Sequence, residues 1–204
     1  MGIIPVELQG IEQWAGCIVG IILGLIVQGD AQEFFVHMFE TFSQRTKIRY
    51  ELNPLHHLDP WSIPVLLFAG WGWSKRRVAE PSYFPTRPIP RCLVPLSGPL
   101  ANFAMVGIMS SIYLILPITF LEIAIAINIQ MALANLIIPI PPLALGRALC
   151  CPFESMRAQM RSVEYSGTLI ILALVLLAYT THWDIFRSLI MEPSTTILKW
   201  VLYR

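Results

Sequence analysis

Charged residues are scarce in this chain. Only 13% of its 204 residues are Asp, Glu, Lys or Arg, whereas 55% are hydrophobic, and a soluble domain has about a quarter charged residues. This composition excludes a disordered chain, a coiled coil and most soluble globular folds. The formal net charge is only +1, so the clustered basic excess that nucleic-acid binding needs is also absent. We therefore expect an integral membrane protein that has no nucleic-acid partner.

Cysteine and targeting signals are also sparse. The cysteines show no metal-binding spacing, and two adjacent ones make poor disulfide partners; they are Cys17, Cys92, Cys150 and Cys151. We interpret them as small buried hydrophobic residues rather than redox groups. The N-terminal residues lack the basic region and cleavage site of a secretory signal peptide.

Long uncharged stretches are the main positive feature. Four stretches contain no charged residue, and they cover residues 13–29, 92–121, 123–146 and 165–183. A helix that crosses a membrane needs roughly 17 to 25 residues, so each stretch is adequate. Glu122 separates the second stretch from the third, which predicts a helical hairpin turning between Pro117 and Glu122. The sequence predicts an all-α polytopic bundle of about four to six hydrophobic segments, forming one transmembrane domain over residues 1–204.

A fifth apolar segment, Pro60 to Ser74, is short and rich in Gly, Pro and Trp. It is either a re-entrant piece or a short, distorted spanning helix, and the sequence leaves both open. Basic residues concentrate in the two connections on either side of the predicted hairpin. If the fifth segment does not cross, both connections lie on one side, which the positive-inside rule makes cytoplasmic or the organellar equivalent. The expected location is a bacterial inner membrane or an organellar inner membrane.

Four short blocks of distinctive residues follow one another along the chain. They read NPLHHLDP (53–60), GWSK (72–75), SGPLAN (97–102) and PIPPLALGR (139–147). In this order they resemble the site-2 proteases, which are intramembrane zinc metalloproteases, and in particular their compact bacterial-type branch. That family's pattern runs HExxH, NPxxHxDP, GWxKP, AGPxAN and NxxPxPPLDGGR. The retained positions are Asn53, Pro54, His57, Asp59, Pro60, Gly98, Pro99, Asn102, Pro139, Pro141, Pro142 and Gly146.

The resemblance covers residues 13–147 as a protease-like core, and residues 148–204 form a C-terminal span plus an interfacial amphipathic helix. Some scaffold positions depart from the family. Arg76 replaces the Pro of GWxKP, and Ser97 replaces the Ala of AGPxAN. The first Asn of NxxPxPPLDGGR corresponds to Leu136, and Asn135 lies one residue before it.

The resemblance implies a chemistry that this chain has lost. In the family, two His of HExxH bind zinc, the Glu activates a water, and the Asp of PPLDGG is the third protein ligand. Counted back from Asn53 at the family's spacing, the two His fall on Gln28 and Gln32 and the Glu falls on Gly29. The Asp falls on Ala144. The resemblance therefore implies a catalytically dead member, with no catalytic residue, no metal and no other cofactor.

Other residues near these positions allow alternatives. A rebuilt metal site is conceivable, but no pair among its candidates has a recognised ligand spacing; the candidates are Asp30, His37, His56 and His57. Gln28 and Gln32 either form hydrogen bonds across the bundle or line a groove for a partner segment, and we favour the first. The capping spacing of Asp30 and Glu33 predicts that one helix ends at Gly29 and another begins at Asp30.

Three functions remain open at this point. We favour a structural or accessory subunit of a larger membrane complex, whose partners are other integral membrane subunits and lipids. Candidate partner contacts are Trp14, Phe39 and Trp200. A client-binding pseudoprotease in membrane-protein assembly or regulation is the alternative, and an active metalloprotease with a rebuilt site is the least favoured. The segments 183–190 and 195–203 are expected to lie at the membrane interface, where Trp, Tyr and Lys are common.

Overall fold

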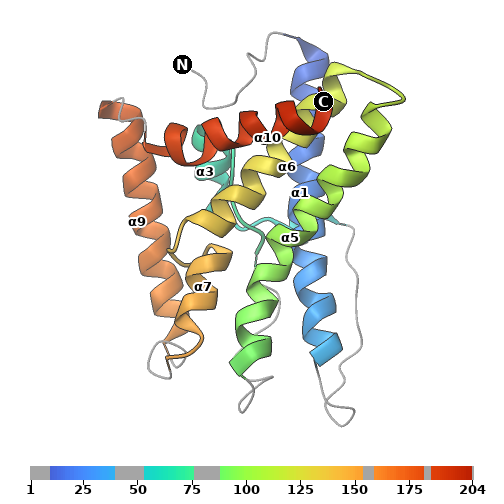
Figure 1. Cartoon of the computed structure of the whole chain (residues 1–204). Coiled ribbons are helices and arrows are strands. Elements are labelled where there is room, and N and C mark those ends of the chain that lie inside the picture. Colours follow the sequence, from blue (N-terminus) through green and yellow to red (C-terminus); the bar gives the residue numbers. More distant parts are fainter. Residues whose placement is uncertain (1–9, 40–52, 76–87, 154–158, 182–184, 204) are drawn as a thin grey trace.

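The computed structural model describes residues 10–39, 53–75, 88–153, 159–181 and 185–203, and it builds these parts of the chain from helices (Figure 1). Within these described parts, four helices are long and apolar enough to cross a membrane. They are α1 (Ile11–Phe39), α5 (Pro88–Tyr113), α6 (Thr119–Ile137) and α9 (Met160–Thr181). The predicted all-α polytopic bundle is confirmed.

Helix α6 forms the centre of the bundle. Its apolar window is 78% buried, whereas the corresponding window of α9 is 22% buried. The side chains of α6 itself are buried on all faces of the helix, as expected for a helix that is hydrophobic all round. Among them are Ile123, Ile125, Ile127, Ile129 and Met131. Helix α9 stands at the outer edge (Figure 1) and is therefore the span most open to lipid.

The predicted hairpin between the second and third apolar stretches is confirmed, but its turn lies at residues 114–118 rather than between Pro117 and Glu122, because Glu122 already belongs to the first turn of α6. Helix α5 ends at Tyr113 and α6 begins at Thr119. The carboxylate of Glu12, in the first turn of α1, accepts a hydrogen bond from the backbone N–H of Phe120 at 3.3 Å. This bond satisfies one of the free N–H groups at the start of α6 and fixes the beginning of α1 beside the hairpin turn.

The predicted helix break at Gly29 is wrong, because α1 runs without interruption from Ile11 to Phe39. A single glycine in a helix interior costs only about 1 kcal/mol relative to Ala, which packing on both sides offsets. The buried face of α1 repeats every four residues; its members are Gly16, Gly20, Gly24, Gln28 and Gln32. A Cβ on Gly20 would lie 2.9 Å from the Cα of Ala124, so the small residues let α1 approach α6 closely.

The segment Pro60 to Ser74 is re-entrant. Its helix α3 (Ser62–Ala69) has 8 residues and is roughly 12 Å long, too short to cross a bilayer. Gly70 ends α3 in the left-handed conformation, with φ 73°, and the chain then turns back. Leu58 and Ser74 form an antiparallel bridge, so both ends of the segment lie side by side just after the short helix α2 (Pro54–His57).

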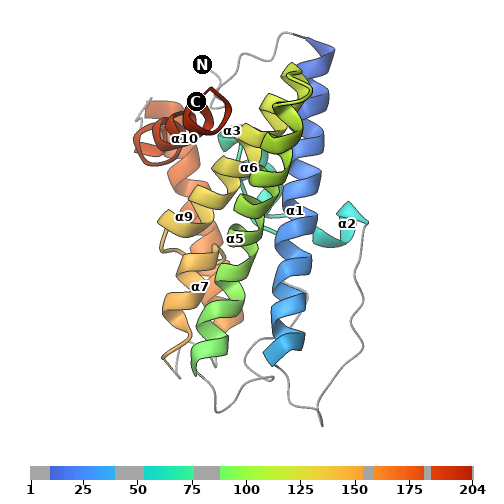
Figure 2. The same cartoon turned by 45° about the vertical axis from the view of Figure 1, so that its right-hand side comes forward.

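The last part of the chain adds two short elements and a span to the bundle. After α6, a proline-rich turn leads into α7 (Ala144–Cys150) and then α9 (Figure 1). A π-helical turn, η2 (Arg187–Met191), continues into α10 (Glu192–Leu202), which runs crosswise to the spanning helices near one end of the bundle (Figure 1) and is seen nearly end-on in Figure 2. Buried Leu198 and Leu202 of α10 belong to the same hydrophobic cluster as residues of α5 and α6. Of the predicted interfacial segment 183–190, residues 183 and 184 lie outside the described part of the chain.

The four cysteines are free thiols, and Cys17, Cys150 and Cys151 are buried, while Cys92 is half-buried. The Cys151 thiol donates a hydrogen bond to the carbonyl of Arg91 at 3.1 Å. Pro95, four residues later in α5, has no N–H to bond that carbonyl. The packing role predicted for the cysteines therefore fits the structure.

Candidate functional site

Three of the four positions that the resemblance assigns to catalysis lie on α1. Gln28 and Gln32 are on one face of this helix, four residues apart, and they are only 1% and 9% exposed. The re-entrant segment, α5 and α7 supply residues that surround them. Ala144, the fourth assigned position, is buried at the start of α7. The structure therefore buries all four positions, and Arg147, three residues after Ala144, connects α7 to Gln32.

Both amide side chains make hydrogen bonds across the bundle, as we predicted. The backbone N–H of Ser74 donates to Oε1 of Gln28 at 3.2 Å. The Nη2 group of Arg147 donates to Oε1 of Gln32 at 2.8 Å, and Arg147 is buried on α7, three residues after Ala144. In the site-2 proteases, which this chain resembles, zinc would join the helix that corresponds to α1 to the segment that corresponds to the start of α7. Here a charge-assisted hydrogen bond joins α1 to α7 instead.

Gly29 has no room for a side chain. A Cβ at this position would overlap Nδ1 of His57 and would lie 2.8 Å from the Ser74 hydroxyl. His57 is fully buried, and its Nε2 lies 3.6 Å from a carboxylate oxygen of Asp30. The space where a side chain would begin is thus filled by His57, at the end of α2, and by Ser74, at the end of the re-entrant segment.

Gly98 closes the region from the side of α5. A Cβ on Gly98 would lie 2.6 Å from Cγ of Gln28 and 2.7 Å from Nε2 of Gln32. This retained glycine is needed because the α5 backbone touches both amide side chains. Asn102, one turn later, is fully buried, and its amide has no hydrogen-bond partner among the residues that the structure describes.

Retained residues of the first two blocks hold the shape of the re-entrant segment. Asp59 accepts a hydrogen bond from Nε1 of Trp73 at 2.9 Å and another from the backbone of Trp61 at 3.0 Å. The Ser62 hydroxyl accepts a bond from the backbone N–H of Trp73 at 3.0 Å. Asn53 accepts a bond from the backbone of Leu55 at 3.1 Å. The two bonds to Trp73 tie the outgoing and returning parts of the segment together, and the bonds to Trp61 and Leu55 fix local turns.

Asn135 connects three elements, although it lies one residue earlier than the family's Asn. Its Nδ2 donates to the carbonyl of Gly72 at 2.8 Å, and its Oδ1 accepts the backbone N–H of Ala144 at 3.3 Å. The end of α6 is thereby bonded to the re-entrant segment and to the start of α7. Gly146 allows α7 to lie directly on the backbone of the Ile140–Pro141 turn.

Sequence comparison agrees with this resemblance. The chain is 25% identical over 173 residues to "Putative zinc metalloprotease YwhC" of Bacillus subtilis (strain 168), and the aligned part covers 77% of this chain and 78% of that protein. The chain is a membrane protein related to this relative. No family model matches the chain, and no solved structure matches it.

The donor set at the four assigned positions does not fit a zinc ion. Gln28 and Gln32 offer neutral amide oxygens that already accept hydrogen bonds, and Ala144 offers a methyl group. Zinc in proteins is bound by thiolate, imidazole or carboxylate. Within the described ranges, no three His, Cys, Asp or Glu residues are grouped to hold a metal. Of the predicted rebuilt set, the structure brings Asp30 and His57 together, whereas His56 is exposed.

Two contributors to this site were not predicted. Arg147 is the last residue of the fourth block and Ser74 a variable position of the second, and neither position indicates a contact with α1. The spacing Gly16-x3-Gly20-x3-Gly24 was a usable signal for close helix packing, and extending it by two steps reaches Gln28 and Gln32. No pattern in the sequence indicates that Arg147 would reach Gln32, 115 residues away.

Proposed function

We propose that this protein is a non-catalytic, site-2-protease-like membrane protein that serves as a structural or accessory subunit of a larger membrane complex. The observation that carries the proposal is the packing at Gly29. A metalloprotease needs a carboxylate beside its metal to activate water. The position that the resemblance assigns to that carboxylate has no side chain, and its Cβ space is taken by His57 and Ser74.

The polar contacts around Gly29 support a structural role. The carboxamide oxygens of Gln28 and Gln32 are both engaged, one by the re-entrant segment and one by Arg147. Each bond connects elements that are far apart in the sequence. Buried hydrogen bonds of this kind stabilise helix association within a membrane by roughly 0.6 to 2 kcal/mol. We infer that this network maintains the fold where a metal would do so in a protease.

The same burial speaks against the client-binding alternative. A transmembrane segment of another protein would need an open groove that reaches Gln28 or Gln32. Both residues are buried, and Gly98 brings the α5 backbone against them. The region is filled by this chain's own side chains, which favours the accessory-subunit role.

The exposed aromatic residues provide a surface for partners at one end of the bundle. Trp14 and Trp200 are 54% and 60% exposed. They belong to the first turns of α1 and to α10, which lie at the same end of the molecule (Figure 1). Phe39 is half-buried and packs on Phe35 in its own chain, with ring centroids 6.1 Å apart. We propose Trp14 and Trp200 as the stronger candidates for contact with another subunit.

Metal analysis and a cleavage assay test the loss of catalysis. We expect the protein purified in mild detergent to contain no stoichiometric zinc and to leave single transmembrane substrates uncut. A matched sample of an active site-2 protease in the same detergent serves as the positive control. Stoichiometric zinc that disappears in a His57→Ala or Asp30→Ala variant would overturn the proposal and support a rebuilt site.

Gentle solubilisation tests the subunit role. We expect the protein to migrate with stoichiometric companions and photo-crosslinkers at positions 14 and 200 to capture them. A crosslinker at position 28 is the matched control, because that site is buried. Migration as a 23.0 kDa protein without companions would contradict the proposal. Exchangeable helices captured from position 28 would favour client binding.

A further inference from the structure

Arg91, in the first turn of α5, is a buried cation that the proposed function does not use. Arg91 and Arg147 are 4% and 3% exposed, and no Asp or Glu among the described residues is buried to this degree. Arg147 donates to Gln32. Within the part of the chain that the structure describes, Nε of Arg91 has no hydrogen-bond partner and its guanidinium has no ion pair. A guanidinium stays protonated in proteins, so Arg91 carries a buried charge that an anion would stabilise.

Arg91 lies on the inward face of α5. The Cys151 thiol, directly after α7, donates to the carbonyl of Arg91 at 3.1 Å. Arg91 shares a helix face with Gly98, seven residues later, and Gly98 is where the α5 backbone touches α1. Ile89 and Leu93, on the opposite side of α5, are 70% and 44% exposed. The Arg91 side chain is therefore directed toward α1 and α7, whereas its apolar neighbours face lipid.

The start of α5 adds positive charge around Arg91. The N-terminus of a helix carries roughly half a unit of positive charge, which favours anions and disfavours cations. Pro88 and Pro90 have no N–H, so the N–H groups of Ile89 and Arg91 are the donors that the first turn leaves without a carbonyl partner in the helix. The same turn thus offers an oxyanion a guanidinium, two N–H groups and a favourable helix dipole.

The depth of Arg91 in the membrane favours phosphate among the oxyanions. Helix α5 has 26 residues and extends roughly 39 Å. It is longer than the roughly 30 Å hydrocarbon core, so its first turn lies at headgroup level, at the end of the bundle opposite α10 (Figure 1). Basic side chains at this level attract anionic lipids. We propose that Arg91 binds one phosphate group, either of an anionic phospholipid headgroup or of a free phosphate ion, whose geometry the planar guanidinium matches.

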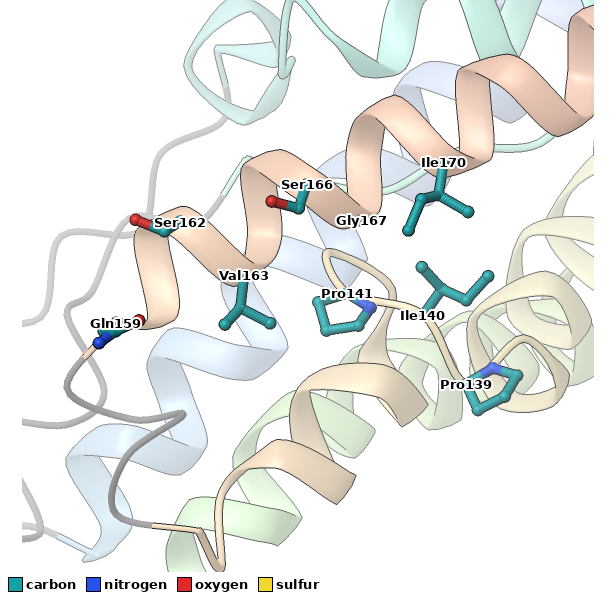
Figure 3. Close-up of a pocket in the computed structure, with 9 residues that line it drawn as sticks. All are labelled: Pro139, Ile140, Pro141, Gln159, Ser162, Val163, Ser166, Gly167 and Ile170. Carbon is teal, nitrogen blue, oxygen red and sulfur yellow. The ribbon is translucent and has the colours of Figure 1, made fainter.

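The depression between α9 and the proline-rich turn after α6 is the other place where a lipid could lie. Its volume is about 420 Å³, and the turn residues Pro139, Ile140 and Pro141 form one of its walls (Figure 3). No charged side chain is among its described lining residues, so nothing there distinguishes an anionic lipid from a neutral one. A change in this depression therefore serves as a control for the site at Arg91.

Native mass spectrometry of the purified full chain tests the lipid as the source of the phosphate. The detergent-solubilised protein is mixed with equal amounts of dioleoyl phosphatidylglycerol and dioleoyl phosphatidylcholine, and singly lipidated protein is counted. We expect phosphatidylglycerol to be preferred by about fivefold, the effect of one basic side chain beside an anionic lipid. Arg91→Met should lose this preference, whereas Arg91→Lys should retain part of it.

Thermal unfolding in detergent tests the free ion as the source. If free phosphate is the ligand, replacing chloride by inorganic phosphate at constant ionic strength should raise the unfolding temperature of the wild-type protein but not of Arg91→Met. The variant should fold, because Met removes an unpaired buried charge and keeps much of the side-chain volume.

Arg161→Met and Ser166→Trp are the matched controls. Arg161 is an exposed arginine at the start of α9, and Ser166 is an exposed residue that lines the depression beside the proline-rich turn. Neither change should abolish the lipid preference or the effect of phosphate. Equal loss in Arg161→Met and Arg91→Met would mean general attraction to basic residues and would overturn the proposal. A wild-type protein that shows neither effect, or effects that persist in Arg91→Met, would also overturn it.

Discussion

The imidazole of His57 lies where the Cβ of any residue other than glycine at position 29 would be. Gly29 is on α1 and His57 ends α2, so the contact joins the first span to the short helix that precedes the re-entrant segment. The Ser74 hydroxyl, on the returning part of that segment, closes the same space. The absence of a side chain at position 29 is thus a packing requirement of this fold.

A methyl group added at Gly29 should therefore destabilise the protein. We expect Gly29→Ala to lower the free energy of unfolding by about 1–3 kcal/mol, the usual cost of overpacking. Gly107→Ala is the matched control, because no atom lies within 4 Å of its added Cβ. That change should be neutral or stabilising by up to about 1 kcal/mol, since Ala favours helix more than Gly. Denaturant unfolding in detergent micelles measures both variants.

A double-mutant cycle then identifies His57 as the cause. In a His57→Ala background the overlap is gone, so Gly29→Ala should cost at least about 1 kcal/mol less than in the wild-type protein. Additive effects of the two substitutions would show that the cost arises from another neighbour, first of all the Ser74 hydroxyl, which lies 2.8 Å from the added Cβ.

The hydrogen bond between Arg147 and Gln32 should also contribute to stability. Gln32→Leu removes the acceptor of a buried guanidinium and should cost about 1.5–3 kcal/mol. Gln32→Glu keeps an acceptor oxygen and should unfold no more easily than the wild-type protein at neutral pH. Thermal unfolding of the purified variants measures the order of stability.

Gln130→Leu provides the control for removing a buried amide. Gln130 is fully buried on α6, and its amide has no hydrogen-bond partner within the described part of the chain. Replacing it with Leu should be neutral or stabilising, because no bond is lost and a desolvated polar group is removed. Equal destabilisation by Gln32→Leu and Gln130→Leu would mean that volume, and not the bond to Arg147, decides the effect.

The spans were predictable from the sequence because lipid imposes simple rules on the backbone. Every spanning segment must satisfy its own hydrogen bonds, so long uncharged stretches become helices, and the hairpin around Glu122 follows from one charge between two such stretches. Composition did not predict whether the segment Pro60 to Ser74 turns back or crosses the membrane. It depends on the pairing of Leu58 with Ser74, a contact between separate parts of the chain.

In the candidate site too, the features set by local spacing were predictable, and the contacts between distant parts of the chain were not. The face shared by Gln28 and Gln32 follows from their four-residue spacing in a helix. The expected break at Gly29 was wrong because local capping signals do not include the His57 contact. The choice of Ser74 and Arg147 as donors depends on tertiary packing, which spacing along the chain does not encode.

The re-entrant geometry makes a prediction about membrane sidedness. In a cysteine-free background, single cysteines at the exposed positions 53 and 75 should react with an impermeant maleimide from the same side as a cysteine at position 161. A cysteine at position 199, on α10, should react from the opposite side, because α10 lies at the other end of the bundle (Figure 1). Labelling of positions 53 and 75 from different sides would show that the segment crosses the membrane.

Tyr203 links the end of α10 to the hairpin and should titrate unusually. Hydrogen bonds with the Tyr113 hydroxyl at 3.4 Å and with the Glu122 carboxylate at 2.9 Å raise the pKa of Tyr203 above its ordinary value. The folded state thus holds the phenolic proton more tightly than the unfolded state, in which the pKa is about 10. Its contribution to stability is complete below that pH and is lost as the pH rises through the higher pKa of the folded protein.

Tyr203→Phe tests this pH dependence. The variant should unfold more easily than the wild-type protein at neutral pH, because the bonds to Tyr113 and Glu122 are gone. The difference between the two proteins should shrink as the pH rises above about 10. Tyr179→Phe is the control, since it removes an exposed phenol on α9 and keeps the ring beside Phe68. Equal stability of wild type and Tyr203→Phe at neutral pH would mean that α10 is held by packing of Leu198 and Leu202 without a contribution from the Tyr203 hydroxyl.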